Sequence, residues 1–138
     1  MNLLLDTMVV SELRRIGSGN VAPRFLAWTE AVALSQAYLS VITLHEMEVG
    51  CLLTARKDPI RSLVYREWLE TVAEAFEGRI VEVSLPIARL AAGYHVPDPA
   101  PMADALIAAT AAELDVTVAT RNTRDFARFG VRLVNPWD

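Results

Sequence analysis

Short apolar runs alternate along this chain with longer segments in which apolar residues recur at helical spacing. The Leu3–Leu5 run predicts a strand buried on both faces, because neither face carries a polar side chain. Similar short runs predict four further strands, at residues 37–41, 79–83, 116–120 and 131–134. Strands that alternate with helices are typical of βαβ units. The sequence therefore predicts a three-layer α/β/α sandwich with a central, mainly parallel five-stranded sheet.

The helical segments are bounded by proline and glycine. Pro23, Pro59 and Pro86 suit the first turn of a helix, and Gly78 and Gly130 suit the end of one. The pattern predicts helices at residues 9–15, 23–33, 43–57, 59–78, 86–93, 102–114 and 122–129. The helix at 102–114 is apolar almost all round, so we expect it to be buried.

Length and composition favour a single domain spanning residues 1–138, since 138 residues suffice for one core and 53% of them are hydrophobic. The net charge of −4 gives no electrostatic footprint for nucleic acid. One cysteine, Cys51, excludes a disulfide framework and a cysteine-based zinc site. The start of the chain does not resemble a signal peptide, and no segment suits a bilayer span. We therefore expect a cytoplasmic protein without a membrane partner.

Four acids follow predicted strands or begin a predicted helix: Asp6, Glu46, Asp104 and Asp125. Each has a local structural explanation. Asp6 suits a helix cap, and Asp104 suits the positive end of a helix dipole. Glu46 lies three residues after Thr43, which matches a capping box, and Asp125 has a looser version of the same spacing after Asn122.

The four acids taken together favour a shared site. In a parallel sheet, the carboxyl ends of all strands and the amino ends of the following helices lie at one edge. Carboxylates that converge there repel one another unless cations neutralise them. Oxygen ligands without cysteine or histidine select Mg²⁺ or Mn²⁺, and such ions promote phosphodiester hydrolysis. The residues therefore predict a metal-assisted hydrolase.

Other polar residues are weaker candidates. Arg14, Arg121 and Arg124 lie near the predicted acid edge and are candidates for holding the phosphates of such a substrate, although exposed arginines are ordinary in any protein. Neither histidine is placed for a catalytic role, and Cys51 is expected to pack as a small hydrophobic residue.

The ordered motifs resemble those of PIN-domain ribonucleases over nearly the whole chain. The motif segments are Leu4–Leu13, Ser40–Glu46 followed by Gly50, Asp104–Ala111 and Thr120–Phe126, and the ending Asn135–Trp137 resembles that of a bacterial subgroup. The subgroup is the VapC toxin family, particularly its FitB-like members.

This resemblance implies a Mg²⁺/Mn²⁺-dependent endoribonuclease that hydrolyses RNA with a metal-activated water. It implies that Asp6, Glu46, Asp104 and Asp125 are the catalytic, metal-binding carboxylates, and that Thr7, Thr120 and Asn122 brace them by hydrogen bonding. It also implies a homodimer and a cognate antitoxin protein that occludes the site.

Position 8 is usually small or polar in this motif, but here it is Met8. This departure from the motif predicts that a hydrogen bond beside the acids is lost and that catalysis is weaker. An alternative function is therefore a catalytically weak PIN-like module that acts by binding RNA or a partner. A phosphatase of the haloacid-dehalogenase type is disfavoured, because such sites resemble Asp-x-Asp-x-Thr and Met8 occupies the place of the second acid.

Overall fold

Five parallel strands form the centre of the molecule in the computed structural model, which describes residues 2–138. Strand β1 (Leu3–Leu5) pairs with β4 (Thr117–Ala119), which pairs with β5 (Leu133–Val134); β2 (Leu39–Ser40) pairs with β3 (Ile80–Val81). A parallel bridge between Leu4 and Tyr38 joins the two groups. The resulting order is β3-β2-β1-β4-β5, which confirms the predicted five-stranded parallel sheet.

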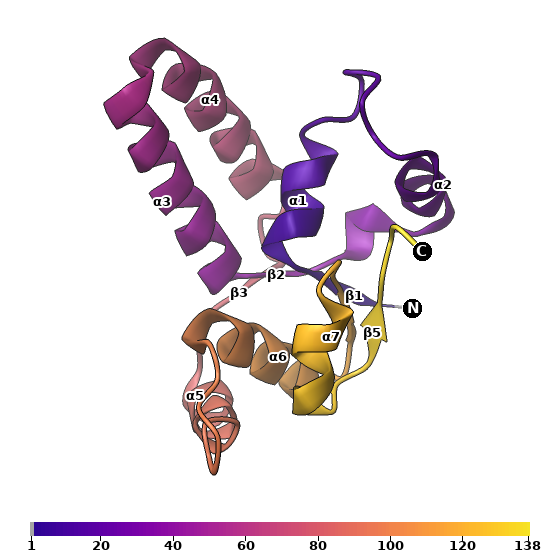
Figure 1. The fold of residues 1–138 in the computed structure, drawn as a ribbon, viewed down its shortest axis with the longest axis vertical. Helices are drawn as coiled ribbons and strands as arrows, with labels where there is room; N and C mark the ends of the chain where they lie inside the picture. Colours follow the sequence, from indigo (N-terminus) through magenta and orange to yellow (C-terminus); the bar gives the residue numbers. More distant parts are fainter. Residues whose placement is uncertain (1) are drawn as a thin grey trace.

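Seven α-helices cover the sheet (Figure 1). Their bounds are α1 (Thr7–Leu13), α2 (Pro23–Ala31), α3 (Val41–Lys57), α4 (Pro59–Ala75), α5 (Leu85–Gly93), α6 (Met102–Leu114) and α7 (Thr123–Phe126), with 3₁₀ turns η1 (Leu34–Gln36) and η2 (Ala127–Phe129). Helices α3 and α4 form a hairpin that projects away from the sheet (Figure 1). Among residues 2–138, none of the helices combines the length and apolar character that crossing a membrane requires.

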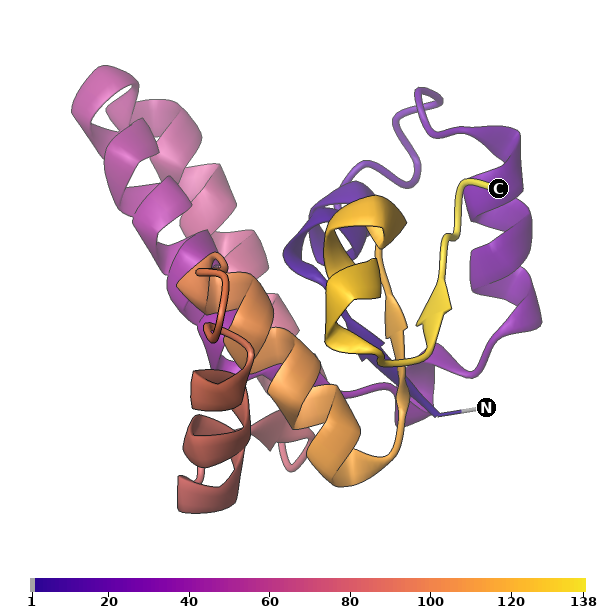
Figure 2. The same cartoon turned by 60° about the horizontal axis from the view of Figure 1, so that its bottom comes forward.

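Alternate residues of β1 face two separate cores. Leu3 and Leu5 pack into a cluster with residues of α1 to α4, whereas Leu4 packs with residues of α5, α6 and α7. This alternation follows from the two-residue repeat of a strand, and it places helices on both faces of the sheet. Figure 2 shows α5 beside α6 on the face away from α2. The three-layer sandwich predicted from the sequence is confirmed.

Helix α6 has the predicted bounds and is buried as expected, since Ala105, Ile107, Ala108, Ala109 and Ala111 are fully enclosed. Several other predicted bounds were too long. The segment predicted as a helix at 122–129 divides into α7 and the turn η2, and β2 and β3 are shorter than the runs at 37–41 and 79–83. Ala37 and Val83, beside these strands, pack into the core, and Tyr38 forms only an isolated bridge to Leu4, so hydropathy alone overstates the length of the strands.

Candidate functional site

Asp6 lies at the carboxyl end of β1 and caps α1. Its Oδ1 atom accepts the Thr7 backbone N–H at 2.7 Å, and its Oδ2 atom accepts the Thr120 hydroxyl at 2.7 Å. Its side chain is buried, with 6% of the residue exposed. The capping explanation for Asp6 therefore holds, but it uses only one carboxylate oxygen, and the second oxygen is tied to a neighbouring strand.

Thr120 links the ends of β1 and β4. Its hydroxyl donates to Asp6 and accepts the Asn122 backbone N–H at 3.0 Å. A hydroxyl has both donor and acceptor capacity, so one buried side chain fixes the Asp6 carboxylate and the turn into α7. The Asn122 side chain makes no capping bond to α7, so the capping box predicted for Asn122 and Asp125 is wrong.

Glu46 is held by α1 rather than by the start of its own helix. The Thr7 hydroxyl donates to Glu46 Oε1 at 2.6 Å. Helix α3 begins at Val41, where the Ser40 hydroxyl accepts the Ile42 N–H at 3.0 Å, so the capping box predicted for Thr43 and Glu46 is wrong. Glu46 lies in the second turn of α3, and its carboxylate is directed across to the β1–α1 junction.

Asp104 lies in the first turn of α6 and Asp125 in the short helix α7. Burial raises the pKa of Asp104, and the charges of Asp6, Glu46 and Asp125 raise it further. Burial also raises the pKa of Asp6, the hydrogen bonds from Thr120 and Thr7 lower it, and the charge of Glu46 adds to the increase. The structure thus brings Asp6, Glu46 and Asp125 within electrostatic range of Asp104, at one edge of the sheet.

The donor set fits a hard divalent cation. It consists of carboxylates from four segments. Two of them, Asp6 and Asp104, have a raised pKa because burial disfavours their charged form and neighbouring acids add repulsion that no cation neutralises. Within residues 2–138, no three acidic, histidine or cysteine side chains are already arranged to hold a metal ion. Mutual repulsion opposes such close approach, so ligation requires rotation of the exposed side chains of Glu46 and Asp125.

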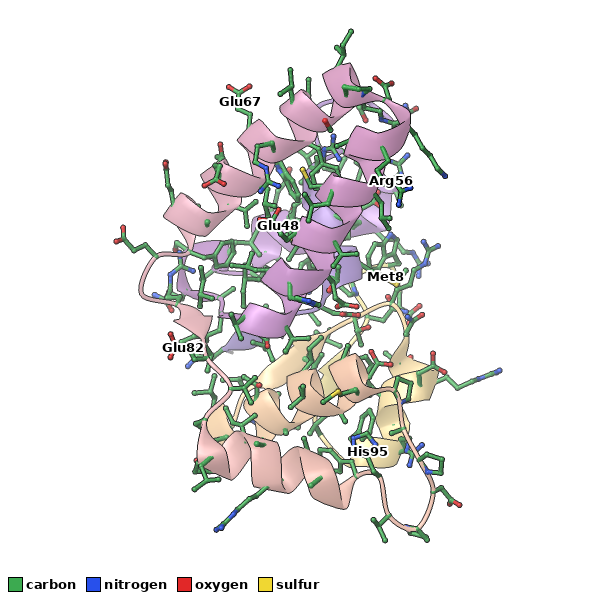
Figure 3. All side chains as sticks on the ribbon, turned by 90° about the vertical axis from the view of Figure 1, so that its left-hand side faces the viewer. Met8, Glu48, Arg56, Glu67, Glu82 and His95 are labelled. Carbon is green, nitrogen blue, oxygen red and sulfur yellow. The ribbon has the colours of Figure 1, made fainter. Side chains whose placement is uncertain are left out.

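Met8 lies beside this group, in the first turn of α1, and is 39% exposed. The Asn122 side-chain amide donates to Met8 Sδ at 3.3 Å. Figure 3 shows Met8 where the α3–α4 part of the molecule meets the α5–α7 part. A thioether is a weak acceptor, so Asn122 is fixed less firmly here than a hydroxyl or amide at position 8 would fix it.

The three candidate arginines separate into two locations. Arg121 and Arg124 follow β4, next to Asn122 and Asp125; the Arg121 guanidinium lies 5.0 Å from the centre of the Trp137 ring. Arg14 follows the last residue of α1, at the opposite end of that helix from Asp6, where it stacks on Tyr65. The sequence predicted Arg14 near the acids, but it lies eight residues after Asp6, which places it about two helical turns away.

Comparison with known proteins places this arrangement in a family. The model of the PIN domain matches residues 3–131. The chain is 35% identical to Toxin FitB of Neisseria gonorrhoeae, with 98% of both chains covered, and 33% identical to VapC ribonuclease Y4jK of Sinorhizobium fredii, with 99% of this chain and 98% of the relative covered.

Solved structures give the same result. A structure described as FitAB bound to IR36 DNA fragment matches with a TM-score of 0.85 and 34% identity, over 99% of this chain and 96% of that chain. The crystal structure of FitAcB from Neisseria gonorrhoeae matches with a TM-score of 0.85 and 35% identity, over 98% of both chains. The fold, the ordered motifs and the full-length similarity agree, and the chain belongs to the PIN domain family, with FitB and VapC proteins as its relatives.

Proposed function

We propose that this chain is a Mg²⁺/Mn²⁺-dependent endoribonuclease and the toxin component of a toxin–antitoxin pair. The observation that carries the proposal is the convergence of Asp6, Glu46, Asp104 and Asp125: Thr7 and Thr120 hold Glu46 and Asp6 at the end of β1, and the charges of Asp6, Glu46 and Asp125 add to burial in raising the pKa of Asp104. The similarity to proteins named as toxins and as VapC ribonucleases supports RNA as the substrate and a cognate antitoxin as a partner.

Asp6, Glu46, Asp104 and Asp125 would hold the cation. When bound, a divalent cation activates a water and stabilises the charge that develops on a phosphate. Asp6 is the fixed ligand, because Thr120 and the Thr7 amide hold both of its oxygens in place. Glu46 and Asp125 are exposed and can turn toward an incoming substrate, while Asp104 enters from a rigid buried helix.

Arg121 and Arg124 lie on the side of this group where β4 ends, and their charges suit RNA phosphates. Asn122 and Thr120 orient the same turn, through the contacts to Met8 and Asp6. The chain's own residues therefore provide one fixed acid, two adjustable acids and adjacent positive charge. This combination orients a phosphodiester at the acid edge and leaves it open to in-line attack.

The test uses purified, partner-free protein with structured RNAs, in Mg²⁺, in Mn²⁺ or in EDTA, beside Asp6→Asn and Asp104→Asn variants. We expect cleavage in Mn²⁺ that both variants and EDTA abolish. Glu113→Gln is the matched control, because Glu113 is an exposed acid of α6 outside the acid group. RNA binding without cleavage in either divalent metal contradicts the nuclease and supports the binding module instead.

We also infer a homodimer. A mostly apolar hollow between α5 and α6 is lined by Ala88, Ala92, Leu106 and Met102, of which Met102 is 71% exposed. Surface of this kind is unfavourable in water and marks an interaction site. Light scattering of the purified chain tests this inference; a monomeric mass across micromolar concentrations contradicts it.

A further inference from the structure

A cleft between α1 and α4 is separate from the acid edge. It has a volume of about 520 Å³ and is lined by three arginines, Arg14, Arg15 and Arg61, together with Tyr65 and Trp68. No acidic side chain belongs to its lining, although the protein as a whole has a net charge of −4. The volume lies in the range of pockets that bind one small molecule or one nucleotide. The cleft is therefore a local concentration of positive charge and aromatic surface on an acidic protein.

Arg14 is pre-organised in this cleft. Its guanidinium carbon lies 4.5 Å from the centre of the Tyr65 ring and 5.6 Å from that of Trp68, and the two rings meet edge to face. A stacked guanidinium is held in place by its planar faces, while its N–H edge remains free to donate paired hydrogen bonds to a phosphate. Less side-chain entropy is then lost when an anion binds.

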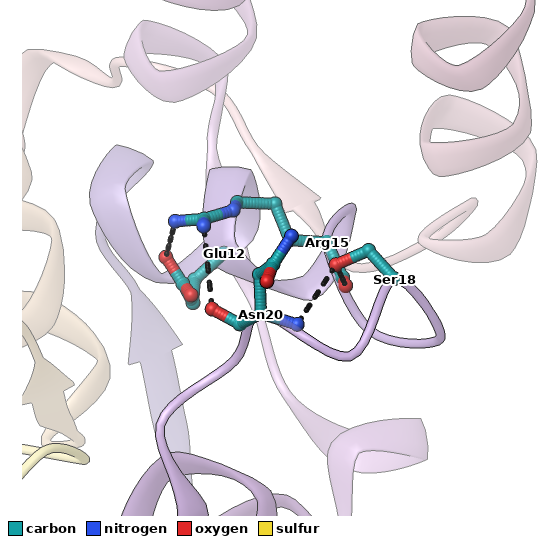
Figure 4. Close-up of polar contacts among 4 residues, drawn as sticks. All are labelled: Glu12, Arg15, Ser18 and Asn20. Atoms are coloured by element: carbon teal, nitrogen blue, oxygen red, sulfur yellow. Dashed lines mark hydrogen bonds and ion pairs between the residues drawn. The ribbon is translucent and has the colours of Figure 1, made fainter.

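Arg15 has a different task, which Figure 4 shows. Its guanidinium pairs with Glu12 at 3.5 Å and donates to the Asn20 carbonyl at 3.2 Å, and the Ser18 hydroxyl donates to the Arg15 carbonyl. These contacts fold the loop after α1 into a wall of the cleft. Arg15 is thus a positioning residue, and its charge is already partly neutralised.

Arg14 and Arg61 supply the available charge. Within the part of the chain that the structure describes, neither guanidinium forms an ion pair. Asp58 lies close to Arg61 in sequence, but its carboxylate accepts the Arg61 backbone N–H at 3.0 Å and caps α4. Two unpaired guanidinium groups therefore face a cleft that also offers the Ser11 side chain.

The cleft lies at the C-terminal end of α1, and the acid edge lies at the N-terminal end of the same helix. Thr7, which binds Glu46, is in the first turn of α1, and Arg14 follows seven residues later. At 1.5 Å per helical residue, the two positions are separated by about 10 Å along the helix axis. A single RNA strand extending from the acid edge over α1 reaches the cleft within a few nucleotides.

We propose that the α1–α4 cleft is a second RNA subsite, in which Arg14 and Arg61 hold a phosphodiester of the single strand and the adjacent base packs against the Arg14–Tyr65–Trp68 stack. The proposal rests on the proposed ribonuclease function for the identity of the ligand. Charge paired with stacked planar groups is the combination that binds single-stranded nucleic acid without strong sequence preference.

The test measures binding, so it does not depend on cleavage. Fluorescence anisotropy of a labelled single-stranded RNA of about 12 nucleotides is followed against salt, in EDTA, for the wild type, Arg14→Ala, Arg61→Ala and the double variant. We expect binding about tenfold weaker in each single variant. The slope of log K against log salt is negative, and its magnitude is expected to decrease by about 0.7 for each arginine removed. Arg14→Lys keeps the charge and loses the stack, so we expect an intermediate affinity with an unchanged slope.

Arg89→Ala is the matched control, since Arg89 is an exposed arginine of α5, outside the cleft. Arg61→Ala keeps the test decisive if Arg14→Ala fails to fold, because Arg61 is exposed and, among residues 2–138, its guanidinium is stacked on no aromatic ring. Equal affinities and slopes in Arg61→Ala and Arg89→Ala overturn the proposal. If Arg14→Ala and Arg61→Ala weaken the binding of an acidic partner protein and leave the RNA affinity unchanged, the cleft is a protein-binding site and the proposal is overturned. If the wild type binds RNA through these arginines but does not cleave it in Mn²⁺, the ribonuclease function fails and the subsite stands.

Discussion

The Thr120 hydroxyl donates a 2.7 Å hydrogen bond to Asp6 Oδ2 across the pair of strands β1 and β4. The bond joins residues 114 positions apart and lowers the pKa of Asp6, against burial, which raises it. The bond therefore favours the charged form of this buried carboxylate and offsets part of the effect of burial. Most of the proposed chemistry depends on that ionised state.

Thr120→Val removes this bond with little change in volume. The pKa of Asp6 then rises further, because the charged form loses a donor. We expect metal affinity and cleavage to fall by about 10- to 100-fold. We also expect the pH–rate profile to move to higher pH. Calorimetric Mn²⁺ titration and initial cleavage rates measure the two effects. Thr110→Val, at a buried threonine that bonds only within α6, is the control.

Thr7→Val tests the link between α1 and α3. The Thr7 hydroxyl is the side-chain donor that holds Glu46 toward the β1–α1 junction. Without it, the exposed Glu46 side chain samples other rotamers, so we expect the metal concentration for half-maximal cleavage to rise about tenfold, with little change in melting temperature. Thr7→Ser retains the hydroxyl and is expected to behave as the wild type. Equal loss in Thr7→Ser and Thr7→Val contradicts the role of the bond.

The sequence was sufficient where the evidence is local. The apolar pattern of α6 predicted both its bounds and its burial, and the leucine run predicted β1, because each element is specified by its own residues. The shared edge of a parallel sheet then predicted that acids from distant segments converge. That prediction depended only on the topology of the sheet.

The sequence failed where partners are distant. The spacing of Thr43 and Glu46 fits a capping box, but Ser40 starts α3 two turns before Glu46, and Thr7 captures the carboxylate from another helix. The stacking of Arg14 on Tyr65 is similar, since it depends on the packing of α1 against α4. No periodic pattern encodes such contacts between elements, so only the folded chain reveals them.

Asp104→Asn is expected to stabilise the metal-free protein at neutral pH. The pKa of Asp104 is raised in the folded state, so the folded chain binds the proton more tightly than the unfolded chain does. The contribution of Asp104 to the free energy of unfolding is therefore greatest at low pH, and it is lost as pH rises from the ordinary pKa of 3.8 through the raised value. The uncharged amide removes that loss. Melting temperatures in EDTA between pH 4 and about 8 measure it.

Glu113→Gln, on the exposed face of α6, controls for the change of net charge. An Asp104→Asn variant that melts at or below the wild-type temperature at pH near 7 contradicts the raised pKa of Asp104 in the folded protein.

Met8→Ser is expected to raise the rate of cleavage. Met8 offers the Asn122 amide only a thioether acceptor, at 3.3 Å, and a hydroxyl at this position accepts more strongly. A firmer Asn122 orients the turn that carries Asp125 toward the other acids. We expect kcat/KM to increase about tenfold, without a change in the RNA affinity measured in EDTA. Met8→Leu, which has no acceptor, separates hydrogen bonding from side-chain size; an increase in Met8→Leu as large as in Met8→Ser contradicts this explanation.

Mg²⁺ is expected to raise the melting temperature of the wild type. The acids repel one another in the metal-free fold, and a cation that binds the folded chain alone adds stability that depends on its concentration. At a hundredfold excess over Kd the gain is about 2.7 kcal/mol. Differential scanning fluorimetry with Mg²⁺, Mn²⁺ and K⁺ at matched ionic strength measures it. Asp6→Asn removes the proposed ligand that is held most firmly, so its shift is expected to disappear, while Glu113→Gln keeps the full shift. A wild-type shift that Asp6→Asn retains places the cation elsewhere and contradicts the shared site.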